Sequence, residues 1–171
     1  MDQWFLDQAR NGNVYHSHNT TAGIVTDISA TCTGLVLENP FGSGKELVVA
    51  KMSFTGSTLG NIREVGIVVS TAISESLSTS TTAAVIHNGR VSGSNANNGA
   101  GRSYSIATLA TEPLWFRPLM SARMTGAFEG AQAEVEFDGT VFVMPGTYIA
   151  FSSETADTVG LCSIIWAEID E

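Results

Sequence analysis

The sequence predicts an all-β protein, an antiparallel jelly-roll-like β-sandwich with an N-terminal arm. Short runs of alternating or β-branched residues recur at spacings of roughly ten residues, which is typical of sandwiches and barrels. Charged residues make up 15% of the chain, below the usual share, and Ser, Thr, Gly and Asn replace them. These small polar side chains favour turns over helices, and the sequence contains no convincing amphipathic helix or internal repeat.

The length of 171 residues favours one domain. A chain of this size buries roughly 70% of the surface that it exposes when unfolded, so it needs no metal or disulfide to hold a core. Residues 1–20 differ in composition from the rest and predict the arm, and residues 21–171 predict the jelly-roll β-sandwich domain.

The arm begins with a small apolar group, Trp4, Phe5 and Leu6, which a polar stretch follows. We expect little regular structure here beyond one short helical turn. Two interpretations are open. The apolar group covers one end of the core, or it anchors the arm to a partner, because aromatic clusters make good contact points. The candidate docking residues are therefore Trp4, Phe5 and Leu6.

The first half of the domain alternates strands and turns. Residues 39–45 are rich in turn formers and join two strands, whereas the Ser/Thr-rich segment 74–82 predicts a loop. Alternate residues of the strand after the first turn are apolar and should point inward; they are Val48, Ala50, Met52 and Phe54. The strands expected in this half are 34–38, 46–54, 65–71 and 83–87.

The second half contains a polar loop and six more strands. Residues 92–101 have no large apolar side chain and predict an exposed loop. Pro113 and Pro118 bracket a strand, which suits an edge position. The pair Asp138-Gly139 predicts a tight hairpin between two strands, and residues 144–147 predict another turn. The strands expected here are 104–110, 114–117, 132–137, 140–143, 148–152 and 161–169.

The net charge of −9 makes direct binding to nucleic acid unfavourable, because phosphates carry the same sign. The first residues lack the basic and apolar regions of a signal peptide, and no apolar stretch reaches the roughly 18 residues that cross a membrane. We therefore expect no nucleic-acid or membrane partner, and synthesis in a cytoplasm. Cys32 and Cys162 lie in apolar runs and should be buried free thiols, with a bridge only if their strands are adjacent.

No motif in the sequence predicts catalysis, so we expect no catalytic residue and no enzymatic activity. Residues 42–46 resemble a phosphate-binding loop, but the first glycine, the Mg²⁺-binding Ser/Thr and the following helix are missing. His16 and His18 would share a face in an extended chain, and His87 is the one other imidazole. A metal site is therefore disfavoured, unless symmetry-related copies supply more ligands. We predict no metal and no cofactor.

Two stretches carry a resemblance to a known class of proteins. Residues 34–49 read Gly-Leu-Val-Leu-Glu-Asn-Pro-Phe-Gly-Ser-Gly-Lys-Glu-Leu-Val-Val, and residues 144–151 read Met-Pro-Gly-Thr-Tyr-Ile-Ala-Phe, with Ile-Trp-Ala-Glu-Ile at 165–169. Together they resemble the capsid decoration, or cement, proteins of tailed bacteriophages. The resemblance covers the strand body well and the arm poorly. It implies a jelly-roll homotrimer on the exterior of the virion head, bound to the major capsid protein, which it stabilises.

Two other functions are open. A tail-fibre knob that binds a receptor or a carbohydrate would have the same fold, with a site on loop 92–103, although that loop has no aromatic side chain to stack on a sugar. A metal-dependent enzyme of the cupin type would need clustered ligands inside a barrel, and the three histidines of the chain are few for that purpose.

Overall fold

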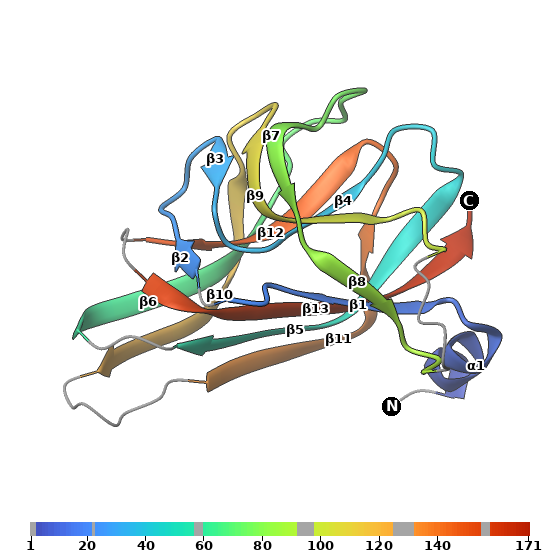
Figure 1. Ribbon diagram of the computed structural model, residues 1–171, viewed down its shortest axis with the longest axis horizontal. Helices are drawn as coiled ribbons and strands as arrows, with labels where there is room; N and C mark the ends of the chain where they lie inside the picture. Colours follow the sequence, from blue (N-terminus) through green and yellow to red (C-terminus); the bar gives the residue numbers. More distant parts are fainter. Residues whose placement is uncertain (1–2, 22, 57–59, 92–97, 125–131, 155–157) are drawn as a thin grey trace.

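In a computed structural model, the described part of the protein consists of two antiparallel sheets packed face to face and one short helix (Figure 1). The structure describes residues 3–21, 23–56, 60–91, 98–124, 132–154 and 158–171. The elements are α1 (Gln3–Asn11), β1 (Val14–His18), β2 (Gly23–Val25), β3 (Thr31–Cys32), β4 (Val36–Asn39), β5 (Lys45–Gly56), β6 (Gly60–Val69), β7 (Ser78–Ala83), β8 (Val85–Asn88), β9 (Arg102–Leu109), β10 (Leu114–Met124), β11 (Gln132–Val143), β12 (Thr147–Ser153) and β13 (Thr158–Asp170).

The strand order confirms the predicted fold class. Sheet A has the order β11-β5-β13-β1-β8, with β2 also paired to β13. Sheet B has the order β10-β6-β12-β4-β9-β3, with β7 also paired to β9. Consecutive strands from β10 to β13 lie alternately in sheet B and sheet A. The strands β4, β5 and β6 alternate between the sheets in the same way. Such crossings between two antiparallel sheets make a jelly-roll-like sandwich.

The main core lies between the two sheets, because a pleated strand points successive side chains to opposite faces. Trp166 of β13 is fully buried, and its ring stacks on that of Tyr15 at a centroid distance of 5.8 Å. The fully buried aliphatic and aromatic side chains around this pair are Val25, Leu35, Leu37, Leu47, Val49, Met52, Phe54, Val65, Ile67, Ile149, Phe151 and Ile164.

The expected arm, residues 1–20, includes a strand of the sandwich. β1 lies between β13 and β8 in sheet A, and Tyr15 is opposite Trp166. Tyr15 and Ser17 are buried, whereas His16 and His18 alternate with them on the other face. The segment has a polar sequence because its outward residues are histidines. The sandwich therefore begins at β1, before the boundary that composition indicated.

The pair Asp138-Gly139 does not form the predicted hairpin. β11 continues in one direction through this pair, because its two halves both pair with β5, one ending at Lys51 and the other starting at Val49. Asp138 (φ 49°) and Gly139 (φ 75°) adopt left-handed conformations, and the extra residues bulge out of the ladder. The prediction was wrong because these dihedral angles serve a bulge as well as a tight turn.

Other local predictions had mixed outcomes. Segment 74–82, predicted as a loop, contains most of β7, whose exposed Ser and Thr side chains conceal its pairing with β9. β10 forms one end of sheet B, as the flanking prolines predicted, and Pro118 lies at a shift in register. The turn between β4 and β5 is confirmed by a 3.1 Å bond from the Ser43 N–H to the Pro40 carbonyl. Residues 92–97 of the expected loop lie outside the described residues.

Candidate docking site

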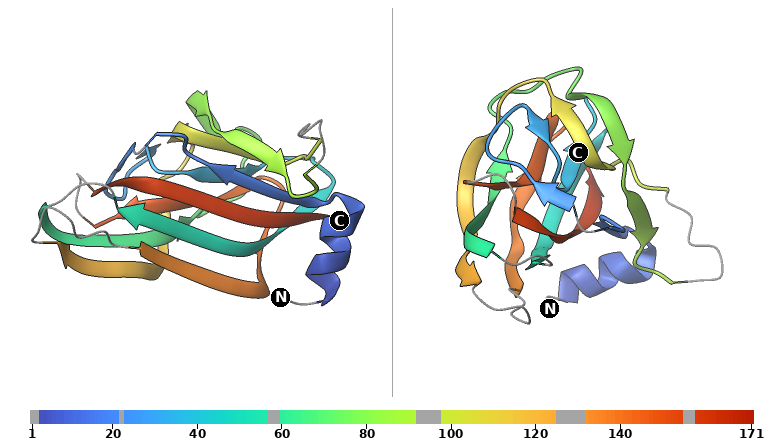
Figure 2. Two further views of the ribbon diagram at one scale, coloured as in Figure 1. Left: turned by 60° about the horizontal axis from the view of Figure 1, so that its bottom comes forward. Right: turned by 60° about the vertical axis from the view of Figure 1, so that its left-hand side comes forward.

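Helix α1 carries the three candidate docking residues. It ends at Asn11 because Gly12 takes a left-handed conformation (φ 81°), in which the N–H groups of Gly12 and Asn13 bond to carbonyls of the last turn. The helix packs on the outer face of sheet A, at one end of the molecule (Figure 2). The segment Gln3–Asn11 is therefore a regular helix packed on the sheet.

The three candidate residues have different surroundings. Phe5 is half-buried and faces the sheet. Trp4 and Leu6 are each 37% exposed, and the Trp4 ring meets the Phe5 ring edge-on at 5.6 Å. The buried sheet residues beneath Phe5 are Val14, Val48 and Ala167. Phe5 therefore covers the outer face of sheet A and not an end of the core between the sheets, while Trp4 and Leu6 are accessible. Their role in binding a partner stays a prediction.

A cavity of about 140 Å³ opens between the start of the helix and sheet A. Its walls are mostly apolar and its rim is charged. At the rim, Lys51 Nζ lies 2.7 Å from a Glu134 carboxylate oxygen and 3.7 Å from one of Glu136. The lining residues are Trp4, Phe5, Ala50, Lys51, Glu136, Asp138, Gly139 and Ile165.

The rim of the cavity carries net negative charge. The hydrogen bond to Glu134 is the main cause that raises the pKa of Lys51, and the charges of Glu134 and Glu136 raise it further, so the lysine stays protonated. Asp138 is a third carboxylate at the rim, where Lys51 is the one cation among the lining residues. An apolar side chain next to an arginine or lysine of a partner would match both the walls and the rim.

Sequence reasoning missed the sheet half of this cavity. The alternating pattern predicted that Val48 and Ala50 point into the core, but β5 has a bulge at Ala50, which its neighbours on both sides skip. The bulge reverses the alternation, so Val49 enters the core and Val48 lies under the helix. The continuous apolar run at 47–50 was the one signal of this, because both faces of the strand are covered.

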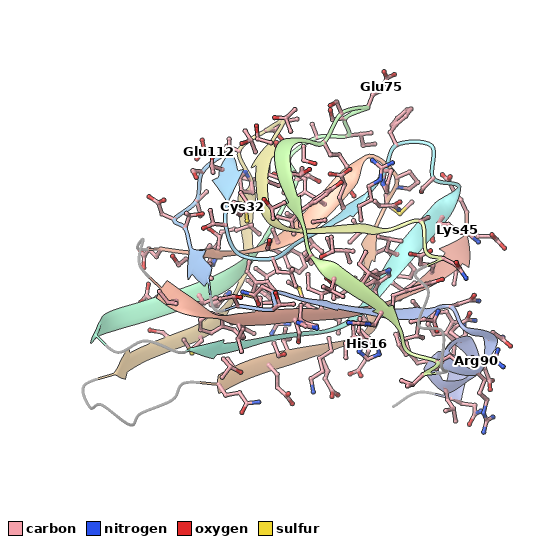
Figure 3. The ribbon with its side chains drawn as sticks, in the orientation of Figure 1. His16, Cys32, Lys45, Glu75, Arg90 and Glu112 are labelled. Atoms are coloured by element: carbon pink, nitrogen blue, oxygen red, sulfur yellow. The ribbon has the colours of Figure 1, made fainter. Side chains whose placement is uncertain are left out.

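All three histidines gather on the outer face of sheet A, where His16 lies opposite Ile165, a lining residue of the cavity. His16 lies opposite His87 across the β1–β8 ladder, and the His18 ring stacks on that of His87 at 5.8 Å with an interplanar angle of 15°. Figure 3 shows His16 where β1 and β8 run together. Stacked rings do not direct their nitrogens at one point, and within the described part of the chain no three His, Cys, Asp or Glu side chains are placed to hold a metal ion.

The histidine cluster predicts a pH dependence of stability. Burial, followed by the charge of His87, lowers the pKa of His16 in the folded protein. The unfolded chain therefore binds a proton before the folded one does, and stability present above pH of about 6.5 is lost as the pH falls toward the folded value. We expect the free energy of unfolding to fall less between pH 7 and 5 in a His16→Gln variant than in the wild type, measured by urea denaturation. Equal slopes in the two proteins would contradict this assignment.

The two thiols are buried in the fold, and the lysine of the segment that resembles a phosphate-binding loop forms an ion pair. Cys32 and Cys162 are buried and unbridged, as predicted. Burial raises the pKa of Cys32 to about 11, which keeps its thiol neutral. Lys45 follows the turn between β4 and β5 and pairs with Asp170 at 2.5 Å near the C-terminal end of β13 (Figure 3).

Within the described part of the chain, no helix is long and apolar enough to cross a membrane; α1 spans nine residues.

Comparisons with known proteins identify no relative of this chain. The chain matches no protein-family model, and no curated protein or solved structure is significantly similar to it.

Proposed function

We propose that the protein is a structural virion component that binds the outside of a tailed-phage head through the major capsid protein and stabilises the head. The resemblance of residues 34–49 and 144–151 to decoration proteins supports the proposal. The structural observation that carries it is the exposure of Trp4 and Leu6 on a packed helix, beside an apolar cavity with an acidic rim.

This arrangement suits docking to a protein surface. Tryptophan is prominent among the few residues that dominate interface energies. A side chain held on a packed helix also loses less conformational freedom on binding than one on a mobile arm. The cavity can receive an apolar side chain of the capsid, and the carboxylates around Lys51 attract a neighbouring basic residue.

The homotrimer that the resemblance implies would multiply this site. The three copies of α1 in one trimer would contact capsid subunits related by the same symmetry. Once one copy of α1 binds, the binding of the other two copies is intramolecular. Each site could then be weak while the trimer dissociates slowly. The acidic charge of the chain fits a partner surface with positive charge.

The test is co-sedimentation with heads assembled without the protein. Deleting residues 1–20 is unsuitable, because it removes β1, which lies between β13 and β8 in sheet A. We instead expect the double variant Trp4→Ala, Leu6→Ala to bind at least about 30-fold more weakly than the wild type, since truncating a hot-spot residue removes about 2 kcal/mol or more. Phe5 remains in place to hold the helix on the sheet.

The matched control is Ile106→Ala, in which an equally accessible apolar side chain is truncated on β9 of the other sheet. It should bind heads like the wild type. Unchanged binding of the double variant would remove α1 from the docking site, and failure of the wild type to sediment with heads would reject the capsid as its partner.

A further inference from the structure

Four segments without any charged side chain or histidine meet on one part of the surface. They are residues 39–44, 69–74, 113–116 and 140–149, and we call the surface that they form the charge-free surface. The rest of the chain contains all 17 acidic and 8 basic residues. Figure 3 labels four of these, of which Lys45 and Glu75 directly follow, and Glu112 directly precedes, one of the four segments each.

Backbone contacts show that the four segments are neighbours. The Gly146 N–H donates to the Asn39 carbonyl at 2.8 Å, and the Gly146 carbonyl accepts from the Ser74 N–H at 2.9 Å. Leu114 lies opposite Val69 where β10 pairs with β6. The turn before β12 therefore joins the loop after β4 and the loop after β6, and the start of β10 borders the same region.

The charge-free surface is strongly apolar. Apart from Trp115, which lines a different pocket together with Glu64 and Glu154, its large exposed apolar side chains range from 38% exposed at Met144 to 66% at Ile73. They are Phe41, Ile73, Leu114, Phe116, Phe142 and Met144. Phe116, Phe142 and Met144 line a groove of about 350 Å³, and Phe41 and Ile73 both lie against Gly146. Large exposed apolar patches often mark an interaction site.

We infer that the charge-free surface is where copies of this chain contact one another. Each copy has a net charge of −9, so two copies repel each other where their acidic faces approach. The charge-free surface lets identical chains bury apolar area without desolvating an unpaired charge. A basic partner would instead be attracted to the carboxylates around Lys51. The inference rests on the proposed homo-oligomer and names its contact, but it does not depend on the capsid.

The edge strands of the two sheets favour contact through side chains. The groove lies between Phe116 on β10 and Phe142 on β11, and these strands are the ends of sheets B and A. β10 contains Pro118 and three shifts in register, which disrupt the regular edge that a strand of another molecule would need. Copies would therefore meet by packing their exposed aromatic and aliphatic groups rather than by extending a sheet.

The test measures molar mass by size-exclusion chromatography with light scattering, at a series of protein concentrations. We expect an oligomer for the wild type and at least tenfold weaker self-association for Ile73→Asp and for Phe116→Asp, because each places a charge in the contact. Ile106→Asp, an exposed site on β9 outside the surface, should assemble like the wild type. Far-ultraviolet circular dichroism and the thermal midpoint verify that each variant folds.

A wild-type protein that stays monomeric at the highest concentration would overturn the inference, and so would oligomers of unchanged strength in both variants. Salt gives an independent readout. Since the contact is apolar, the oligomer should persist in 0.5 M NaCl, a concentration at which exposed ionic contacts are largely screened. Dissociation by salt would assign the contact to charged residues elsewhere. None of these outcomes involves heads, so the capsid proposal is tested separately.

Discussion

Replacing Trp166 by alanine should lower the free energy of unfolding by about 3–5 kcal/mol, the usual result of removing a fully buried aromatic side chain. The side chain is fully buried between the sheets and stacks on Tyr15. Its Nε1–H also donates to Glu168 at 3.1 Å. The substitution thus leaves a large cavity and removes one of the donors that satisfy a buried carboxylate.

Chemical denaturation in urea measures this loss. The same substitution at Trp115, which is 37% exposed on sheet B, provides the matched control and should lower stability by less than half as much. A Trp166→Ala protein with stability close to that of the wild type would contradict the packing of sheet A against sheet B at this position.

The substitution Asn39→Asp should lower the free energy of unfolding by at least about 3 kcal/mol at neutral pH. Asn39 is fully buried, and its side-chain N–H groups donate to the carbonyls of Lys45 and Val143 at 2.7 and 2.8 Å. Its Oδ1 accepts from the Ser43 hydroxyl at 2.6 Å. An aspartate of the same shape has no N–H to give, and it places a negative charge against two carbonyl oxygens.

Two comparisons identify the cause of this loss. Asn39→Ala removes the same two donors without adding charge and should lower stability by about 2 kcal/mol, less than the aspartate does. The difference in the free energy of unfolding between Asn39→Asp and the wild type should also shrink on acidification. Burial raises the pKa of the introduced carboxyl, so the folded variant takes up a proton at a higher pH than the unfolded variant does. An aspartate variant no less stable than the alanine variant would show that charge is not the cause.

The sandwich could be predicted from the sequence because most strands are patterned by burial. Turn formers at 39–45 and 144–147 mark ends of strands, and Pro113 and Pro118 predict the edge position of β10. Four strands escaped. β2 and β3 have only three and two residues, and the other two have unusual outward residues: β1 alternates histidines with its buried side chains, and β7 is almost all Ser and Thr. Periodicity detects a strand by the contrast between apolar residues on one face and polar residues on the other, and this contrast is weak in these segments.

The candidate site was less predictable than the fold. The apolar group at Trp4 and Phe5 could be recognised locally, but its cavity depends on two bulges, at Ala50 and at Asp138-Gly139, that change which face a side chain occupies. A one-residue shift reverses every following residue, so a small local irregularity decides the surface. The histidine cluster is likewise made by the pairing of β1 with β8, which no local pattern reveals.

The pairing of β1 with β13 has a consequence for biosynthesis. Val14 is opposite Ala167, so two neighbouring strands of sheet A are separated by most of the other strands in sequence order. The ribosome must therefore synthesise β2 to β12 before β1 and β13 can pair, and sheet A leaves its apolar face uncovered during that time. Folding should be slow for a protein of this size, and a nascent chain that stalls before β13 would be a substrate for chaperones and proteases.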